Sequence, residues 1–352
     1  MNIFTSTLNQ MGVLGLFMAI GFIVKKLKAV PDNASAVLSK LENTVFLPAL
    51  VLGTFIENFR VSTLSEAWQP LVISLVLELI VIPIGILSAR LATKDGFIRK
   101  MYTYGLCFAN FGFMGNAVVQ ALFSAELYQT YIIFTLPMWT LIYVWAVPGL
   151  LIDRDDTAET KKDRIIASLK AIANPMFIAL LIGAIIGITG LGEVLSKPLM
   201  DTEYVVSAQG DISVAKNAVP LFIMTVINVC GSCMSPIAMM LTGITFASID
   251  IKKVLSNVSI YVVTFLRLIV YPLVLGGIIW LLRTYVSFIG NFFTQELFTC
   301  FICAISMPLG LNTVVVPAAY GKDTSIPAGM ALVSHVLSIG TIPLIFMIFG
   351  LA

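Results

Sequence analysis

Two charged residues, Glu78 and Arg267, each stand in the middle of a strongly apolar stretch of the chain. Each is followed by Leu-Ile-Val and then, five residues after the charge, by a proline: Pro83 in one stretch and Pro272 in the other. A charge at the depth of a bilayer is costly, so it usually has a partner or a function. The two residues therefore fit either a structural ion pair or a split role, in which Arg267 attracts an anion and Glu78 carries a coupling proton.

His335 is the only histidine of the chain, and it too lies in an apolar stretch. Histidine titrates near neutral pH, so proton coupling is one interpretation. The other is a polar side chain whose hydrogen bonds are satisfied inside the fold. The sequence leaves both open.

Asparagine, glycine and proline gather in two further apolar stretches, residues 107–119 and 303–315. When Asn116 is set on Asn312, a cysteine in each stretch also coincides, which indicates a duplication. Glycine and proline weaken helices, and backbone groups freed inside a bilayer must find other partners. We therefore predict two broken, crossed helices whose half-helix N-termini direct positive dipole ends at a bound anion. The alternative is close packing of helices through small residues. The candidate substrate-binding residues are Asn110, Gly115, Asn116, Pro308, Asn312 and Thr313.

The composition indicates what kind of elements position these residues. The chain is 59% hydrophobic and only 11% charged, and its mean hydropathy is +0.98. Soluble domains carry about 25% charged residues, so this chain has too few polar residues to cover a globule in water. We predict an integral membrane protein that is surrounded by the lipid bilayer. The net charge of +2 is confined to loops and gives no reason to expect nucleic-acid binding.

Apolar stretches of about 20 residues, the length that crosses a bilayer, occur ten times, and the alternation typical of membrane strands is absent. We predict an all-α membrane protein with ten transmembrane helices near residues 9–26, 38–56, 69–90, 101–123, 128–151, 172–190, 218–246, 257–282, 298–319 and 327–351.

The loops predict the orientation. With the N-terminus outside, most lysines and arginines fall in cytoplasmic loops, as the positive-inside rule requires. Both termini are therefore expected on the extracytoplasmic side of the plasma membrane. A charged cytoplasmic linker at 152–171 leaves five helices on each side of it. Because five is odd, the second half enters the membrane from the opposite side. If the halves 1–151 and 172–352 are repeats, as the duplication indicates, they are therefore inverted repeats, the second with an outer insertion at 191–217.

Motifs for ATP hydrolysis, zinc peptidases and serine hydrolases are missing, so we expect neither enzyme activity nor a cofactor. Two Cys-x-x-Cys pairs, at 230–233 and 300–303, have the spacing of a thiolate metal site. They lie in apolar helical stretches, however, where cysteine packs as a small hydrophobe, and no metal site is expected. Lys40 and Glu42, near the start of the second helix, are expected to reach the membrane interface.

Several stretches together resemble the auxin efflux carrier family, which includes bacterial malate-permease-like proteins and the plant PIN-type auxin exporters. The residues that carry the resemblance are Asn110-Phe-Gly112-Phe-Met-Gly115, Met307-Pro308 with Asn312, Ala319-Tyr320-Gly321-Lys-Asp323, Arg267-Leu-Ile-Val-Tyr-Pro272 and Phe46-Leu47-Pro48-Ala49-Leu50. The chain has Ala117 where the family usually has a proline, and Thr313 at the equivalent place of the second half. The breaks are therefore expected to depend on glycines and on Pro308 and Pro317.

The resemblance implies a fold similar to that of the bile-acid symporters, with two inverted five-helix repeats and crossed, broken helices four and nine. It implies a scaffold of helices one, two, six and seven. A transport unit of helices three to five and eight to ten would move against this scaffold as an elevator. The resemblance also implies small organic anions as substrates and assembly as a homodimer.

The predicted function is secondary active transport of a small organic anion, either a malate-like dicarboxylate or another weak carboxylic acid, with H⁺ or Na⁺ as the candidate coupling ion. One alternative is a cation-coupled or cation-exchanging carrier on the same fold, although helices four and nine carry no acidic residue at the crossing. Another is a membrane sensor that binds a ligand without transporting it.

Overall fold

The computed structural model describes residues 3–59, 61, 68–152, 175–192, 219–248, 252, 254 and 256–351, and every regular element within these ranges is a helix. The predicted linker at 152–171 and insertion at 191–217 lie almost wholly outside these ranges and remain predictions.

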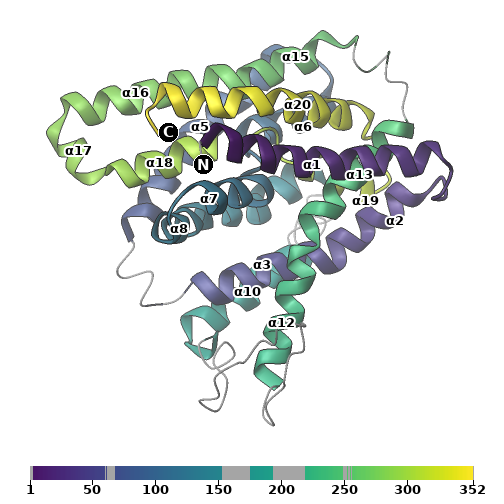
Figure 1. Cartoon of the computed structure of the whole chain (residues 1–352), viewed down its shortest axis with the longest axis horizontal. Coiled ribbons are helices and arrows are strands. Elements are labelled where there is room, and N and C mark those ends of the chain that lie inside the picture. The colour runs from purple at the N-terminus through teal and green to yellow at the C-terminus, as the bar shows by residue number, and fades with distance from the viewer. Residues whose placement is uncertain are drawn as a thin grey trace, which may run out of the picture.

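The first half of the chain forms a series of helices, whose α-helices are labelled in Figure 1. The π-helical segments between them are called η here. In chain order the elements are α1 (Ile3–Lys26), α2 (Ala34–Leu41), η1 (Glu42–Phe46), α3 (Leu47–Asn58), α5 (Trp68–Ala92), α6 (Gly96–Cys107), η2 (Phe111–Gly115), α7 (Asn116–Leu122), α8 (Ala125–Leu141) and η3 (Ile142–Leu151).

The second half continues in the same way. Its helices are α10 (Pro175–Ile188), α12 (Val219–Ser232), α13 (Met234–Ser248), α15 (Val258–Phe265), η4 (Leu266–Val270), α16 (Tyr271–Tyr285), α17 (Ser287–Phe292), α18 (Gln295–Ile305), α19 (Asn312–Ala319) and α20 (Ser325–Ile348).

Six helical stretches in the described part of the chain are long and apolar enough to cross a membrane. They are Ala34–Asn58, Trp68–Ala92, Glu126–Leu151, Phe222–Ser248, Val258–Tyr285 and Ser325–Ile348. The apolar helices Pro175–Ile188 and Gln295–Ile305 are shorter. Each of the ten predicted stretches contains helix, but those near 101–123 and 298–319 are interrupted, which leaves pieces too short to span by length alone.

Prolines shape three of the long helices. The π-helical segment η1 precedes Pro48, η4 precedes Pro272, and η3 contains Pro148. A proline has no N–H group, and its ring clashes with the carbonyl four residues earlier. A locally wider turn accommodates that clash without ending the helix.

Glycines let two helix pairs pack closely. A Cβ atom at Gly21 of α1 would overlap the backbone of Met240, and one at Gly243 of α13 would overlap the backbone of Met18. The two helices therefore pack closely against each other (Figure 1). In the same manner α10 packs along α3, where Gly183 contacts Leu52.

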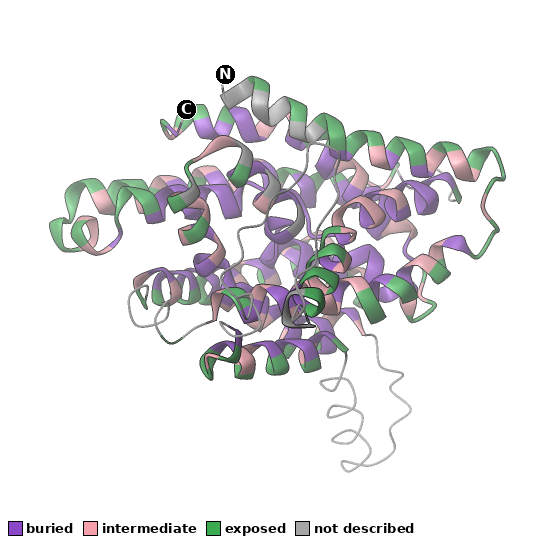
Figure 2. Cartoon of the chain, turned by 60° about the horizontal axis from the view of Figure 1, so that its bottom comes forward, coloured by how far each residue is buried: buried purple, intermediate pink, exposed green. Residues whose placement is uncertain are grey.

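The buried core is centred on the interrupted stretches, and exposed residues cover the outer helix faces (Figure 2). Many of the exposed side chains are apolar, for example Leu16, Leu79, Phe222 and Val274. A soluble protein rarely exposes so much contiguous apolar surface. An apolar exterior is what the acyl chains of a bilayer require.

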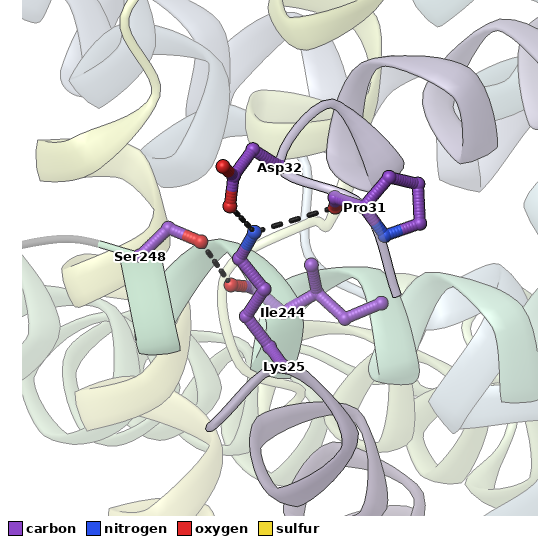
Figure 3. Close-up of polar contacts among 5 residues, drawn as sticks. All are labelled: Lys25, Pro31, Asp32, Ile244 and Ser248. Carbon is purple, nitrogen blue, oxygen red and sulfur yellow. Dashed lines mark hydrogen bonds and ion pairs between the residues drawn. The ribbon is translucent and has the colours of Figure 1, made fainter. Parts of the chain in front are cut away.

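The turn between α1 and α2 is fixed by Lys25. Its ammonium group donates to the carboxylate of Asp32 at 2.8 Å and to the carbonyl of Pro31 at 3.3 Å (Figure 3). Figure 3 also shows the neighbouring end of α13, where the Ser248 hydroxyl donates to the carbonyl of Ile244. The hydrogen bond from Lys25 lowers the pKa of the Asp32 carboxyl group below its ordinary value of 3.8. This exposed contact ties the end of α1 to the start of the next helix.

Candidate functional site

The two interrupted stretches meet at their breaks. α6 ends at Cys107 and α18 ends at Ile305, and the chain beyond each passes the other in antiparallel fashion, with Ala109 paired to Leu309. The N–H of Asn110 donates to the carbonyl of Pro308 at 2.7 Å, and the N–H of Gly310 donates to the carbonyl of Phe108 at 3.3 Å. Backbone groups freed by each break are thus satisfied by the other break. We call residues 108–110 and 308–310 the crossing.

Both chains return to helix directly after the crossing. η2 begins at Phe111 and leads into α7, while α19 begins at Asn312. A small cavity of about 10 Å³ lies between these first turns. Its lining includes Asn110, Phe111, Gly112, Gly310, Leu311 and Asn312. The first N–H groups of a helix have no partner within the helix and carry a partial positive charge, so two such ends face one cavity.

The breaks differ in part from those predicted. Pro308 and Gly310 lie within the second break, as expected, whereas Pro317 lies inside α19. Gly112 and Gly115 follow the first break rather than forming it. Cβ atoms at these two glycines would overlap the ring of Trp139 and the hydroxyl of Tyr131, so the glycines let η2 pack against α8.

Asn110 and His335 contact each other. His335 Nδ1 lies 2.7 Å from the carbonyl of Ala331, so Nδ1 carries the proton and donates. Nε2 must then accept, and the Asn110 amide nitrogen donates to it at 2.9 Å. This arrangement leaves the amide oxygen of Asn110 buried and without a protein partner. The ring also lines an apolar cavity of about 440 Å³ between α1, α13 and α20.

Asn312 is the counterpart of Asn110 on the other half-helix. Its amide nitrogen donates to the hydroxyl of Tyr104 at 2.8 Å, and its buried amide oxygen has no protein partner. Thr313 next to it is fully buried, and its hydroxyl donates to the carbonyl of Gly310 at 2.8 Å. Thr313 therefore ties down the crossing backbone rather than lining the small cavity.

Arg267 connects the ends of the first half-helices. It lies in η4 with 2% of its surface exposed. Its Nη1 donates to the carbonyl of Leu106 at 2.9 Å, and its Nε donates to the carbonyl of Met307 at 3.3 Å. Carbonyls at helix C-termini lack partners within the helix and attract cations. One guanidinium group thus satisfies both sides of the crossing.

Glu78 lies near Arg267 without pairing with it. The two side chains do not approach within 4.0 Å, the limit for an ion pair. Glu78 is buried in α5, and its Oε1 has no hydrogen-bond partner. Both residues line a cavity of about 20 Å³, which is enough for about one water molecule.

Asn116 faces a different and larger space. It lines a polar cavity of about 490 Å³ between α3, α7, α8 and α12. The side chains of Glu57 and Asn228 meet in this cavity, where the Asn228 amide nitrogen donates to Glu57 Oε1 at 2.9 Å. Trp139 lines both this cavity and the small cavity at the crossing. The polar cavity therefore ends beside the crossing, on the far side of the Trp139 ring.

The cysteine pairs separate in the fold. Cys300 and Cys303 are buried in α18, while Cys230 and Cys233 are half-buried at the end of α12, and all are free thiols. In the described part of the chain, no group of three or more His, Cys, Asp or Glu side chains is placed to hold a metal ion.

Sequence reasoning missed two residues of this region. Trp139 and Tyr104 lie in apolar helices where nothing distinguishes them from other core aromatics.

The expectation for Glu42 was wrong: it is fully buried in η1 instead of reaching the interface. A signal was present, because Ser35, Ser39, Glu42 and Asn43 fall on one face of a helix at spacings of four, three and one.

Comparison with known protein families gives a match over nearly the whole chain. Residues 8–346 match the family described as "Membrane transport protein". No curated protein matches the chain.

Proposed function

Because this chain belongs to the membrane transport protein family, we propose that it is a secondary carrier for a small organic anion that works by alternating access. The substrate class is a malate-like dicarboxylate or another weak carboxylic acid. That the protein is a membrane transporter follows from the family, while the substrate and the mechanism are the proposal.

The proposed architecture is a pair of inverted five-helix repeats, residues 1–151 and 172–352. The packing of α1 on α13 and of α10 on α3 supports it, because an exchange of the two halves turns the first pair into the second. These helices would form the scaffold, and two copies of the chain would assemble as a homodimer. The elements from α5 to η3 and from α15 to α20 would form the transport unit, which contains the crossing.

The observation that carries the proposal is the meeting of two half-helix N-termini at one cavity. Unpaired N–H groups and aligned peptide dipoles make such ends attractive to carboxylates. The amide oxygens of Asn110 and Asn312, buried without partners, would accept hydrogen bonds from hydroxyl or carboxylic acid groups of the substrate. A hydroxy acid offers both kinds of group.

Alternating access requires one side open and the other closed. The polar cavity at the α3 end is the open side, and the α2 end of the same helix is closed against α19. Glu57 and Asn43 mark the two ends, about 21 Å apart at 1.5 Å per residue. With both termini on the extracytoplasmic side of the plasma membrane, the polar cavity would face outward.

A second candidate is a cation-coupled carrier on the same fold. The polar cavity contains an acidic side chain, Glu57, and three neighbouring amide oxygens have no protein partner, those of Asn110, Asn116 and Asn312. Oxygen acceptors of this kind suit Na⁺ or a proton donor better than an anion alone. Coupling to H⁺ or Na⁺ would reconcile these acceptors with an anionic substrate.

The proposal is tested with the full chain in proteoliposomes and a panel of radiolabelled organic acids, malate first, with imposed pH and Na⁺ gradients. Asn110→Ala and Asn312→Ala, which both line the small cavity at the crossing, should each weaken apparent affinity about two- to tenfold, because a hydrogen bond between neutral groups contributes about 0.5–1.5 kcal/mol. Asn291→Ala is the matched control, since Asn291 is exposed on α17, away from the crossing.

Unchanged uptake in both cavity variants would remove the crossing as the substrate site. Binding of an acid without any counterflow would replace the carrier by a membrane sensor. Dependence on a Na⁺ gradient instead of a pH gradient would select the cation-coupled carrier.

A further inference from the structure

Glu42 carries a carboxyl group that the surrounding helices bury completely. It begins the π-helical segment η1, and none of its surface is exposed. Neither of its carboxyl oxygens has a hydrogen-bond partner. A fully ionised carboxylate without a partner is very costly in such surroundings, and a buried acid of this kind takes up a proton instead.

Within the described ranges, no opposite charge faces Glu42 from the elements packed against it. η1 packs against α2, α3, α10, α12, α13 and α19. The helices α10, α13 and α19 contain no ionisable side chain. Lys40 of α2 is exposed, Glu57 lies at the far end of α3, and the one ionisable side chain of α12 is that of Cys230, which carries no positive charge in any form. A proton is therefore the simplest means of neutralising Glu42.

Glu42 lies beside a contact that joins the proposed scaffold to the proposed transport unit. The neighbouring Asn43 donates from its amide nitrogen to the carbonyl of Val315 in α19 at 3.1 Å, and to the carbonyl of Ser39 at 2.9 Å. Ser39 is also fully buried, and its hydroxyl oxygen has no partner. We call residues 39–43 and 315 the closed gate.

We propose that Glu42 is a proton-operated latch: its protonated form stabilises the closed gate, and loss of the proton to water favours the open gate. The inference rests on the alternating access proposed above. On opening, water reaches Ser39, Glu42 and Asn43, the carboxyl O–H bond breaks, and the proton passes to that water. On closing, Glu42 takes a proton from the same solution. One proton is thus linked to each movement of the gate.

The test follows gate opening directly and requires no substrate. In a full-length chain whose five native cysteines are replaced by alanine, Ser39→Cys places a thiol inside the gate. Its labelling rate with a polar maleimide in proteoliposomes is measured against pH. The rate is divided by that of Ala36→Cys, an exposed position on the same helix, to remove the intrinsic pH dependence of the thiol.

The normalised rate should rise about tenfold per pH unit over the range in which the gate is mostly closed, because one proton leaves per opening. Glu42→Gln, which mimics the protonated acid, should label slowly at every pH. Glu42→Asp should keep a pH-dependent rise, which separates titration from packing. Lys40→Gln is the matched control and should behave as the parent chain, because Lys40 is exposed two residues away.

A parent rate that does not change with pH, or an equal rise in Glu42→Gln, overturns the latch. A rate that responds to Na⁺ against choline at constant pH, and not to protons, assigns the site to a cation and also overturns it. The carrier proposal fails separately, through absence of organic acid counterflow. A chain with a pH-dependent gate and no counterflow would keep the latch and lose the carrier.

Discussion

Replacing Arg267 by methionine should loosen both sides of the crossing at once. The substitution keeps much of the apolar stem and removes the guanidinium group that donates to the carbonyls of Leu106 and Met307. Both carbonyls are then left buried without that donor. Because the two half-helices are held by the same side chain, the damage is expected at both breaks.

The magnitude follows from the two hydrogen bonds. Hydrogen bonds to charged groups contribute about 1.5–3 kcal/mol each. The bond to Met307 is long at 3.3 Å, and polar contacts in membrane proteins average about 0.6 kcal/mol. We therefore expect Arg267→Met to destabilise the fold by about 2–4 kcal/mol. Arg267→Lys, which keeps the charge but not the two-pronged geometry, should cost about half as much.

Reversible unfolding in mixed micelles of increasing denaturing detergent measures this loss. Hydrogen exchange adds a local readout: the amides of Asn110 and Gly310, which pair across the crossing, should exchange faster in Arg267→Met. The exposed Arg90 at the end of α5 provides a control, since Arg90→Met removes a charge outside the crossing.

Two results would refute the reasoning. One is a stability of Arg267→Met within about 0.5 kcal/mol of the parent, the spread expected for a neutral surface change. The other is recovery of most of the lost stability by adding Glu78→Ala. Such coupling would mean that Arg267 serves mainly as the partner of Glu78, whereas the geometry assigns it to the two carbonyls.

Two further outcomes follow from contacts elsewhere. Gly112→Ala should destabilise the protein by about 1–3 kcal/mol in the same unfolding assay, because the added Cβ would overlap the ring of Trp139. Gly340→Ala on α20 is the control: open space surrounds Gly340, so this change should be neutral or slightly stabilising. Lys25 lowers the pKa of the Asp32 carboxyl group. The stability that this contact adds to the folded state is therefore fully present above pH 3.8, the ordinary pKa, and is lost as the pH falls through the lowered pKa. Parent and Asp32→Asn thermal midpoints should therefore converge in acid; a gap that persists or widens there would contradict the assignment.

Much of the helix layout could be predicted from the sequence. Apolar runs of about 20 residues have few stable arrangements other than helices in a bilayer, and each predicted run contains helix. The asparagines at the breaks were also found from the sequence, because glycine, proline and amide residues are unusual inside apolar runs.

The partners of the buried polar groups could not be predicted in the same way. Glu78 and Arg267 suggested a pair by their opposite charges, but Arg267 bonds to carbonyls of α6 and to the chain beyond α18. Glu42 suggested an interfacial residue by its place near a helix start, yet neighbouring helices cover it completely. Both outcomes depend on residues distant along the chain.

The sequence by itself determined that this protein lies in a membrane, where its helices run, and which stretches break, because these properties depend on local composition and on the loss of backbone hydrogen bonds at glycine and proline. Only the tertiary structure decided that the two breaks bond to each other, that one arginine serves both, and that Glu42 is buried without a counter-charge. These features arise from contacts between segments some 200 residues apart, such as Leu106 with Arg267 and Asn43 with Val315, and no local pattern encodes which distant groups will meet.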